Sequence, residues 1–274
     1  MWVERLARLG YIAKGIVYAI VGVLAVQAAF GTGGRTTDAQ GAVHTIAVQP
    51  FGKFLLVLLA IGLIGYVLWR FVQAFLDPEH KGDDAEGWAK RAGSVISGLL
   101  YAGLAIEAIR LITGSGGGGG GGNSTQDWTA RLLSQPFGQW LVGLVGSFII
   151  GYGFYQFYEA YKAKFRKTLK LREMSVNEET WATRIGRFSL AARGIVFTMI
   201  GFFLIQAAIQ SDANEARGLD GALQTLAQQP YGPWLLGIVA LGLVAYAIHM
   251  WVQAKYRRIP TGKVDNIQRN YVNR

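Results

Sequence analysis

Residues 49–61 read QPFGKFLLVLLAI, a proline corner followed by a run that is apolar on every face. A surface helix of a soluble protein keeps a polar face, and a membrane β-strand would alternate apolar and polar residues. Proline is tolerated in the first turn of a helix and ends whatever precedes it. The run therefore predicts a membrane-spanning helix that begins at the corner.

Six stretches of this chain are long enough to span a bilayer, whose core needs about 20 apolar residues per helix. They lie at roughly 13–31, 52–75, 93–113, 137–160, 191–210 and 232–254. The first also resembles a secretory signal, because basic residues precede it and Val26-Gln27-Ala28-Ala29 offers a small-residue cleavage site. A near copy, Ile205-Gln206-Ala207-Ala208, ends the fifth stretch, so we expect the first stretch to remain as a helix.

The proline corner recurs twice, as Gln135-Pro136-Phe137-Gly138 and Gln229-Pro230-Tyr231-Gly232. The first helix of each unit recurs as well, and Lys14 of the first copy corresponds to Ser97 and Arg193. Each unit crosses the membrane twice, so successive copies share one orientation. The sequence thus predicts an all-α integral membrane protein of six transmembrane helices, built from three tandem two-helix repeats in a pseudo-threefold arrangement.

The predicted boundaries follow the repeats. Repeat 1 covers 1–80 and repeat 2 covers 81–165. A basic linker with the start of repeat 3 covers 166–188, repeat 3 covers 189–258, and a polar tail covers 259–274.

The net charge of +10 is explained by topology rather than by nucleic acid. Basic residues gather at the chain termini and in the loops after even-numbered helices, which predicts that both termini are cytoplasmic. The predicted outer side holds few of them: Arg35, Lys53, Arg131 and Arg217.

The combination of Lys14-Gly15-Ile16-Val17-Tyr18, the Gln-Pro-Phe-Gly corner, Gly65-Tyr66 and Trp69-Arg70, repeated three times, resembles the bacterial membrane family catalogued as domain of unknown function 1206. The resemblance spans roughly residues 5–258. It implies a six-span protein of the bacterial inner membrane and brings with it no activity and no catalytic residues. The middle copy departs from the pattern at Ser97, so a role for the cation there would not be threefold.

Polar groups inside a membrane are costly and are therefore functional candidates. Equivalent repeat positions give a candidate polar ring of Gln27, Arg110 and Gln206, although Arg110 could instead reach the outer interface by snorkelling. Glu107 lies one turn from Arg110, which predicts an intramembrane ion pair.

A second equivalent set, Tyr66, Tyr152 and Tyr246, is a candidate lining of the central axis. His249 and Glu159 are the residues that a lipid-modifying enzyme could use, but neither has an evident partner. The glycines along the spans predict close helix packing.

The connection after the fourth span is the most basic segment and predicts contact with anionic lipid headgroups, or with a soluble partner. Its cations are Lys162, Lys164, Arg166, Lys167, Lys170 and Arg172.

No cofactor, metal or catalytic site is predicted. The chain has no cysteine, and its histidines, His44, His80 and His249, are too scattered to ligate one metal. The glycine run at 116–122 has no preceding strand and predicts a flexible loop rather than a phosphate site.

These observations favour a non-enzymatic membrane scaffold, or an accessory subunit of a larger membrane complex. The alternative is a small channel or transporter with a pseudo-threefold pathway.

Overall fold

A computed structural model describes residues 2–78, 84–115 and 124–259. The glycine run at 116–122, His80 and all but the first residue of the predicted tail lie outside these ranges. Over the described residues the chain is helical, with one isolated bridge between Leu169 and Arg257. The long helices are α1 (Trp2–Ala29), α3 (Gly52–Phe75), α4 (Ala85–Thr113), α6 (Gly138–Lys162), α7 (Val176–Gln210) and α9 (Gly232–Tyr256).

All six long helices are long and apolar enough to cross a membrane, which confirms the six predicted spans. A short helix precedes each proline corner: α2 (Ala39–Ala47), α5 (Ser124–Leu133) and α8 (Leu219–Ala227). Three 3₁₀ turns complete the described part of the fold: η1 (Lys164–Thr168), η2 (Leu171–Glu173) and η3 (Ala213–Glu215). The order of elements repeats three times, as the sequence predicts.

The three proline corners have the same backbone geometry. The third residue of each is left-handed, with φ of 61° at Phe51, 63° at Phe137 and 62° at Tyr231. The glycine that follows donates its N–H to the glutamine carbonyl that opens the corner, as in a turn with proline at its second position. A Cβ on Gly52 would lie 2.3 Å from the carbonyl oxygen of Ala47, so only glycine fits.

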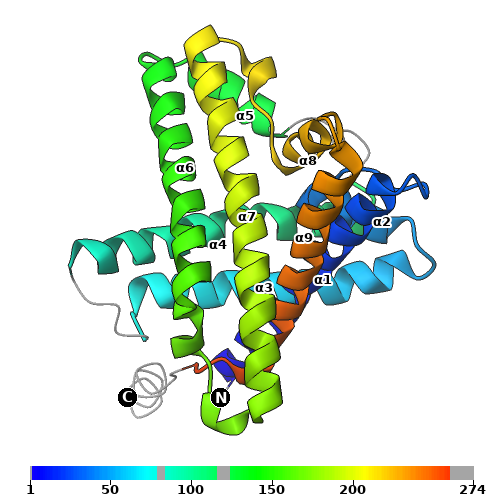
Figure 1. The fold of residues 1–274 in the computed structure, drawn as a ribbon, viewed down its shortest axis with the longest axis vertical. Coiled ribbons are helices and arrows are strands. Elements are labelled where there is room, and N and C mark those ends of the chain that lie inside the picture. The colour runs from blue at the N-terminus through cyan, green and yellow to red at the C-terminus, as the bar shows by residue number, and fades with distance from the viewer. Residues whose placement is uncertain (1, 79–83, 116–123, 260–274) are drawn as a thin grey trace.

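The long helices pack in pairs that join different repeats. α1 packs on α9, α3 on α4, and α6 on α7, so the first helix of each repeat meets the second helix of the preceding one in cyclic order. In Figure 1 the α6–α7 pair runs upright, the α3–α4 pair runs across it, and α1–α9 lies between them. Contacts of α1 with α3 and of α7 with α9 join the three pairs.

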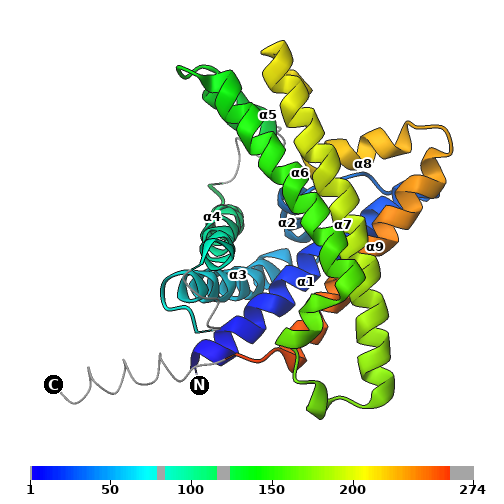
Figure 2. The same cartoon turned by 60° about the vertical axis from the view of Figure 1, so that its left-hand side comes forward.

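The cyclic order of these pairs is that of a threefold ring, but the ring is open. Within each of repeats 1 and 3 the two long helices touch, whereas α4 and α6 of repeat 2 are not among the packed pairs. Figure 2 shows these two helices on separate arms. One reason is that Gly103 of α4 and Gly151 of α6 approach no other helix, contrary to the close packing that the sequence predicts for them.

Other glycines do bring helices into close contact. A Cβ on Gly201 of α7 would lie 2.6 Å from the carbonyl oxygen of Gly146 on α6, and one on Gly194 would lie 3.0 Å from that of Gly153. Small residues that let two backbones approach are the usual basis of helix association in membranes.

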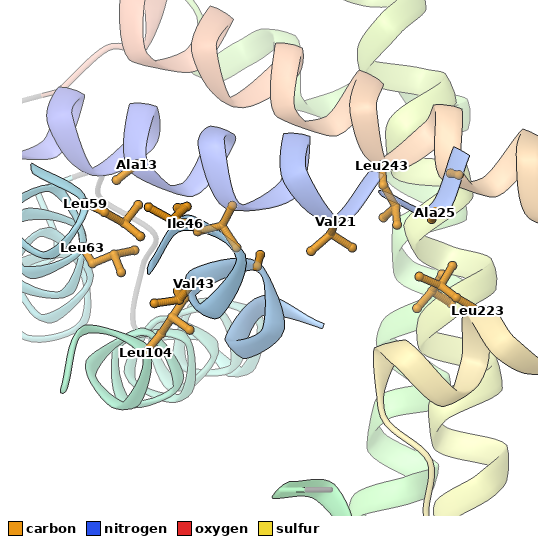
Figure 3. Packing of buried hydrophobic residues seen from close by; sticks show 14 of the residues in the cluster. Ala13, Val21, Ala25, Val43, Ile46, Leu59, Leu63, Leu104, Leu223 and Leu243 are labelled. Atoms are coloured by element: carbon orange, nitrogen blue, oxygen red, sulfur yellow. The ribbon is translucent and has the colours of Figure 1, made fainter. Parts of the chain in front are cut away.

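A buried apolar cluster fills the part of the fold nearest the proline corners (Figure 3). Val43 and Ile46 of α2 lie beside Leu59 and Leu63 of α3 and Leu104 of α4. The short helix therefore fills the space between long helices with side chains.

α7 is longer than the repeat pattern predicts. It begins at Val176, inside the stretch predicted as a linker at 166–188. The reason is local, because Ser175 and Glu178 form a capping box in which each side chain bonds the other residue's N–H.

Gly201→Ala tests the α6–α7 contact. The new methyl group would collide with backbone, so we expect the variant to lose about 1–3 kcal/mol of stability. Gly103→Ala is the matched control, because its methyl group meets nothing within 4 Å and alanine favours helix by up to about 1 kcal/mol. Thermal unfolding in detergent would measure both, and equal melting temperatures would contradict the packing described here.

Candidate functional site

Side chains from equivalent repeat positions converge at the centre of the fold. Lys14, Ser97 and Arg193 occupy one such position, and Tyr66 and Tyr246 belong to another. Together with Arg70, Tyr18 and Tyr101 we call them the cation–tyrosine cluster.

Lys14 is buried against three tyrosines, with 4% of its surface exposed. Its Nζ lies 2.9 Å from the Tyr66 hydroxyl oxygen, to which it donates a hydrogen bond. The same Nζ stands 4.9 Å from the ring centres of Tyr66 and Tyr101 and 5.5 Å from that of Tyr246. Cation–π contacts of this kind contribute about 0.5–2 kcal/mol each.

Arg70 brings a second cation to the same hydroxyl. Its Nε donates to the Tyr66 oxygen at 2.8 Å, and its Nη1 donates to Oε1 of Gln73 at 3.0 Å. Ser97, the counterpart of Lys14 in repeat 2, lies against that hydroxyl as well. Tyr66 therefore holds together side chains of repeats 1 and 2.

Arg193 is the third cation, and it is held by aromatic faces alone. Its guanidinium carbon lies 4.2 Å from the ring centre of Tyr246, 5.0 Å from Phe197 and 5.9 Å from Tyr18. The residue is 8% exposed, and its Nε is buried with no hydrogen-bond partner. A buried guanidinium normally fills its five donor positions, so this side chain has unused binding capacity.

The cluster has many donors and few acceptors. Within the described ranges, none of the three cations lies within ion-pair distance of a carboxylate. The Glu159 carboxylate interacts electrostatically with Arg193, but the two side chains form no ion pair. Burying a charge that is not paired costs several kcal/mol, so the arrangement favours an anion.

The tyrosines follow the threefold order of the helix pairs. The second long helix of each repeat carries a tyrosine whose ring packs edge to face against an aromatic ring on the first long helix of the next repeat. That aromatic residue lies one helical turn after the position aligned with Lys14. The ring centres are 4.7 Å apart for Tyr246 and Tyr18, 4.8 Å for Tyr66 and Tyr101, and 5.1 Å for Tyr152 and Phe197. Tyr66 and Tyr246 are buried, whereas Tyr152 is 39% exposed because its arm of the ring is open.

The predicted polar ring is not assembled. Gln27 and Arg110 are exposed, and Gln206 donates instead to Glu215 of η3 at 2.9 Å. No hydrogen bond joins the three residues in the described part of the chain. They share a repeat position, but it faces outward.

The predicted ion pair of Glu107 with Arg110 is also corrected. The Oε1 of Glu107 lies 3.1 Å from Nε2 of His44, so the carboxylate joins α4 to α2. Arg110 points away into an exposed position. Spacing along one helix cannot anticipate a partner on a different helix.

The basic segment is partly docked on the fold. Arg166 pairs with Glu179, and Lys170 Nζ lies 3.1 Å from Oε1 of Glu173. Phe165 is buried, with its ring centre 5.0 Å from that of His249. The exposed cations of this segment are Lys162, Lys167 and Arg172.

His249 is a buried packing residue in this geometry. It is 2% exposed, and its Nε2 lies 2.8 Å from Nε2 of Gln253. The described residues contain no group of three or more histidine or acidic side chains that could hold a metal ion.

A pocket of about 280 Å³ lies elsewhere, between α1 and α3. Apolar residues line it, among them Leu6, Leu68 and Phe75, and no charged side chain does. It offers no group that could direct chemistry.

Sequence reasoning missed the centre of the site. Arg70, five residues before the end of α3, turns inward to Tyr66, and no pattern in the sequence singled it out as a site residue. The available signal was the recurrence of a cation at Lys14 and Arg193 inside otherwise apolar stretches, which marked a position without showing what surrounds it.

The repeats, the six apolar helices and the absence of strands in the described ranges define a three-repeat helical membrane protein. The chain belongs to the family described as Domain of Unknown Function (DUF1206), which matches residues 9–77, 92–163 and 188–257. It is 40% identical over 258 residues to the uncharacterized protein YxxB of Bacillus subtilis (strain 168), covering 94% of this chain and 92% of that protein. No solved structure gives a significant match.

Tyr66→Phe tests the central hydroxyl. The change removes the acceptor that Lys14 and Arg70 share, and hydrogen bonds to charged groups contribute about 1.5–3 kcal/mol each, so we expect a loss of about 3 kcal/mol. Tyr231→Phe is the control, because that side chain is 81% exposed and should change stability by less than about 0.5 kcal/mol. A Tyr66→Phe protein that melts like the wild type in detergent would show that the hydroxyl does not stabilise these cations.

Proposed function

We propose that this protein binds an anion within the membrane and acts as a small channel or transporter. The observation that supports this is the pair of buried cations Lys14 and Arg193, with the part-buried Arg70 beside them and no carboxylate of the described residues paired to any of the three. Charged side chains inside membranes usually mark the path of a substrate or ion. The role proposed is non-enzymatic.

The burial of Lys14 and Arg193 within long apolar helices supports a site on a pathway across the bilayer. Lys14 stands ten residues after the start of its span at Glu4, about 15 Å along the helix at 1.5 Å per residue. Arg193 is at the middle of α7, seventeen residues from either end. Both side chains turn into the protein, with 4% and 8% of their surfaces exposed, so snorkelling to the interface does not account for them.

The hydrogen bonds within the cluster also distinguish a ligand-binding site from a group of cations with a purely structural role. A structural cation would be expected to satisfy its donors inside the protein, as Arg70 does with Tyr66 and Gln73. Arg193 instead keeps an unpartnered Nε and lies against the rings of Tyr18 and Tyr246. An oxyanion is the acceptor that such a group of donors would bind.

A scaffold or accessory subunit is the second candidate, and the open ring favours it. α4 and α6 do not pack on each other, and they carry exposed apolar side chains that include Leu100 and Trp140. A helix of another membrane protein could fill this side. Purification in mild detergent followed by native mass spectrometry tests the idea, since a stoichiometric protein partner would support it and a lone chain would count against it.

The proposal includes a location and an orientation in the membrane. We place the protein in the bacterial cytoplasmic membrane with both termini in the cytoplasm, on the basis of its basic loops. The exposed cations Lys162, Lys167 and Arg172 would then lie near anionic lipid headgroups.

Anion-dependent stability is the direct test. Full-length protein in detergent would be melted with chloride, phosphate, sulfate and a series of carboxylates. An anion that binds only the folded state should add about 2.7 kcal/mol of stability at a concentration 100 times its Kd. We expect this gain in the wild type and not in Arg193→Gln.

Arg217→Gln is the control, because Arg217 also covers an aromatic ring, Phe203, but on the exposed surface. It should keep the full gain. If no anion stabilises the wild type more than Arg193→Gln, the proposed function is wrong.

A further inference from the structure

We infer that the cation–tyrosine cluster takes an amphiphile, with an oxyanion head and a hydrocarbon tail, that enters sideways from the bilayer between α4 and α6. The inference rests on the proposed function and names its substrate class. Two features of the site support it: the unpartnered Nε of Arg193 beside Lys14, and the partly exposed aromatic rings on the side where α4 and α6 are not a packed pair.

The hydrogen-bond donors of Arg193 and Lys14 indicate that the head group of the ligand is an oxyanion. Arg193 offers a planar guanidinium whose Nε is unused, and such a fork matches the two oxygens of a carboxylate or of a phosphate. Lys14 and Arg193 stand over the same ring, that of Tyr246. An oxyanion at the edge of this ring would lie within reach of both charges.

The apolar residues at the border of the cluster indicate that the ligand has a hydrocarbon tail. Partly exposed aromatic rings lie at this border: Tyr18 on α1 and Tyr101 on α4, which belong to the cluster, and Phe197 on α7 and Tyr152 on α6 beside it. These helices flank the side on which the ring does not close, because α4 and α6 do not pack together. A ligand that approaches there meets aromatic faces and the apolar side chains of the two helices.

The environment of this entrance selects against a small hydrated anion. Leu99 and Leu100 of α4 are 59% and 70% exposed, and Phe148 of α6 is 59% exposed. These are lipid-facing positions at the depth of the spans, where a free inorganic ion would have to give up its water. An amphiphile keeps its tail in the hydrocarbon and exposes only its head to the cations.

The experiment measures binding of radiolabelled palmitate to the full chain in nanodiscs of zwitterionic lipid. Competitors are acetate, inorganic phosphate and methyl palmitate, which has the tail without the charge. We expect palmitate to bind one per chain, with each competitor at least about 100-fold weaker, because head and tail both contribute.

Arg193→Gln should weaken palmitate binding at least about tenfold, and Arg217→Gln should leave it unchanged. If Arg193→Gln does not fold, Arg193→Lys keeps the charge, loses the planar fork, and should still weaken binding about tenfold. Equal palmitate binding by wild type and the folded Arg193 variant would overturn the inference.

The competitors separate the two proposals. Acetate or phosphate binding as tightly as palmitate, with dependence on Arg193, would overturn the amphiphile and leave the anion site intact. Methyl palmitate binding equally well would overturn the inference because the charge would not be recognised. Absence of any Arg193-dependent anion binding would remove both proposals.

Discussion

The buried charges of Lys14 and Arg193, with the part-buried Arg70 beside them, must be compensated, and the rest of the structure is arranged around that requirement. The compensation comes from tyrosines that different helices bring together. Tyr66 accepts hydrogen bonds from Lys14 and Arg70, and Tyr246 covers both Lys14 and Arg193. Because the helix pairs join different repeats, these contacts also hold the repeats together. The side chains that hold the repeats together are therefore the ones to which we assign the proposed anion site.

Most of the fold was predictable because it depends on local properties of the chain. Apolar runs of sufficient length predict spans, and the proline corner predicts where each second helix begins. The corner also recurs with one backbone geometry, as φ at Phe51, Phe137 and Tyr231 shows. α7 begins at a capping box of Ser175 and Glu178, within the segment predicted to hold the basic linker and the start of repeat 3.

The site was less predictable because it depends on contacts between distant segments. Equivalent repeat positions grouped Tyr66 with Tyr246, which the fold buries, and the same argument grouped Gln27 with Arg110, which the fold leaves on the surface. Periodicity gives the position of a residue along a helix. Packing decides which face of a helix contacts another helix. Glu107 of α4, for example, pairs with His44 of α2 and not with Arg110 one turn along its own helix.

The serine at position 97 has a consequence for symmetry. A ring with the same cation in all three copies would offer a ligand three equivalent orientations and would triple the repulsion among charges. With Ser97 in place of a cation, the copies are no longer interchangeable: Lys14 and Arg193 come from the first helices of repeats 1 and 3, and the cation beside Ser97 is Arg70 of a second helix. A threefold scaffold thereby holds one oriented site, which a bound molecule would enter in one way only.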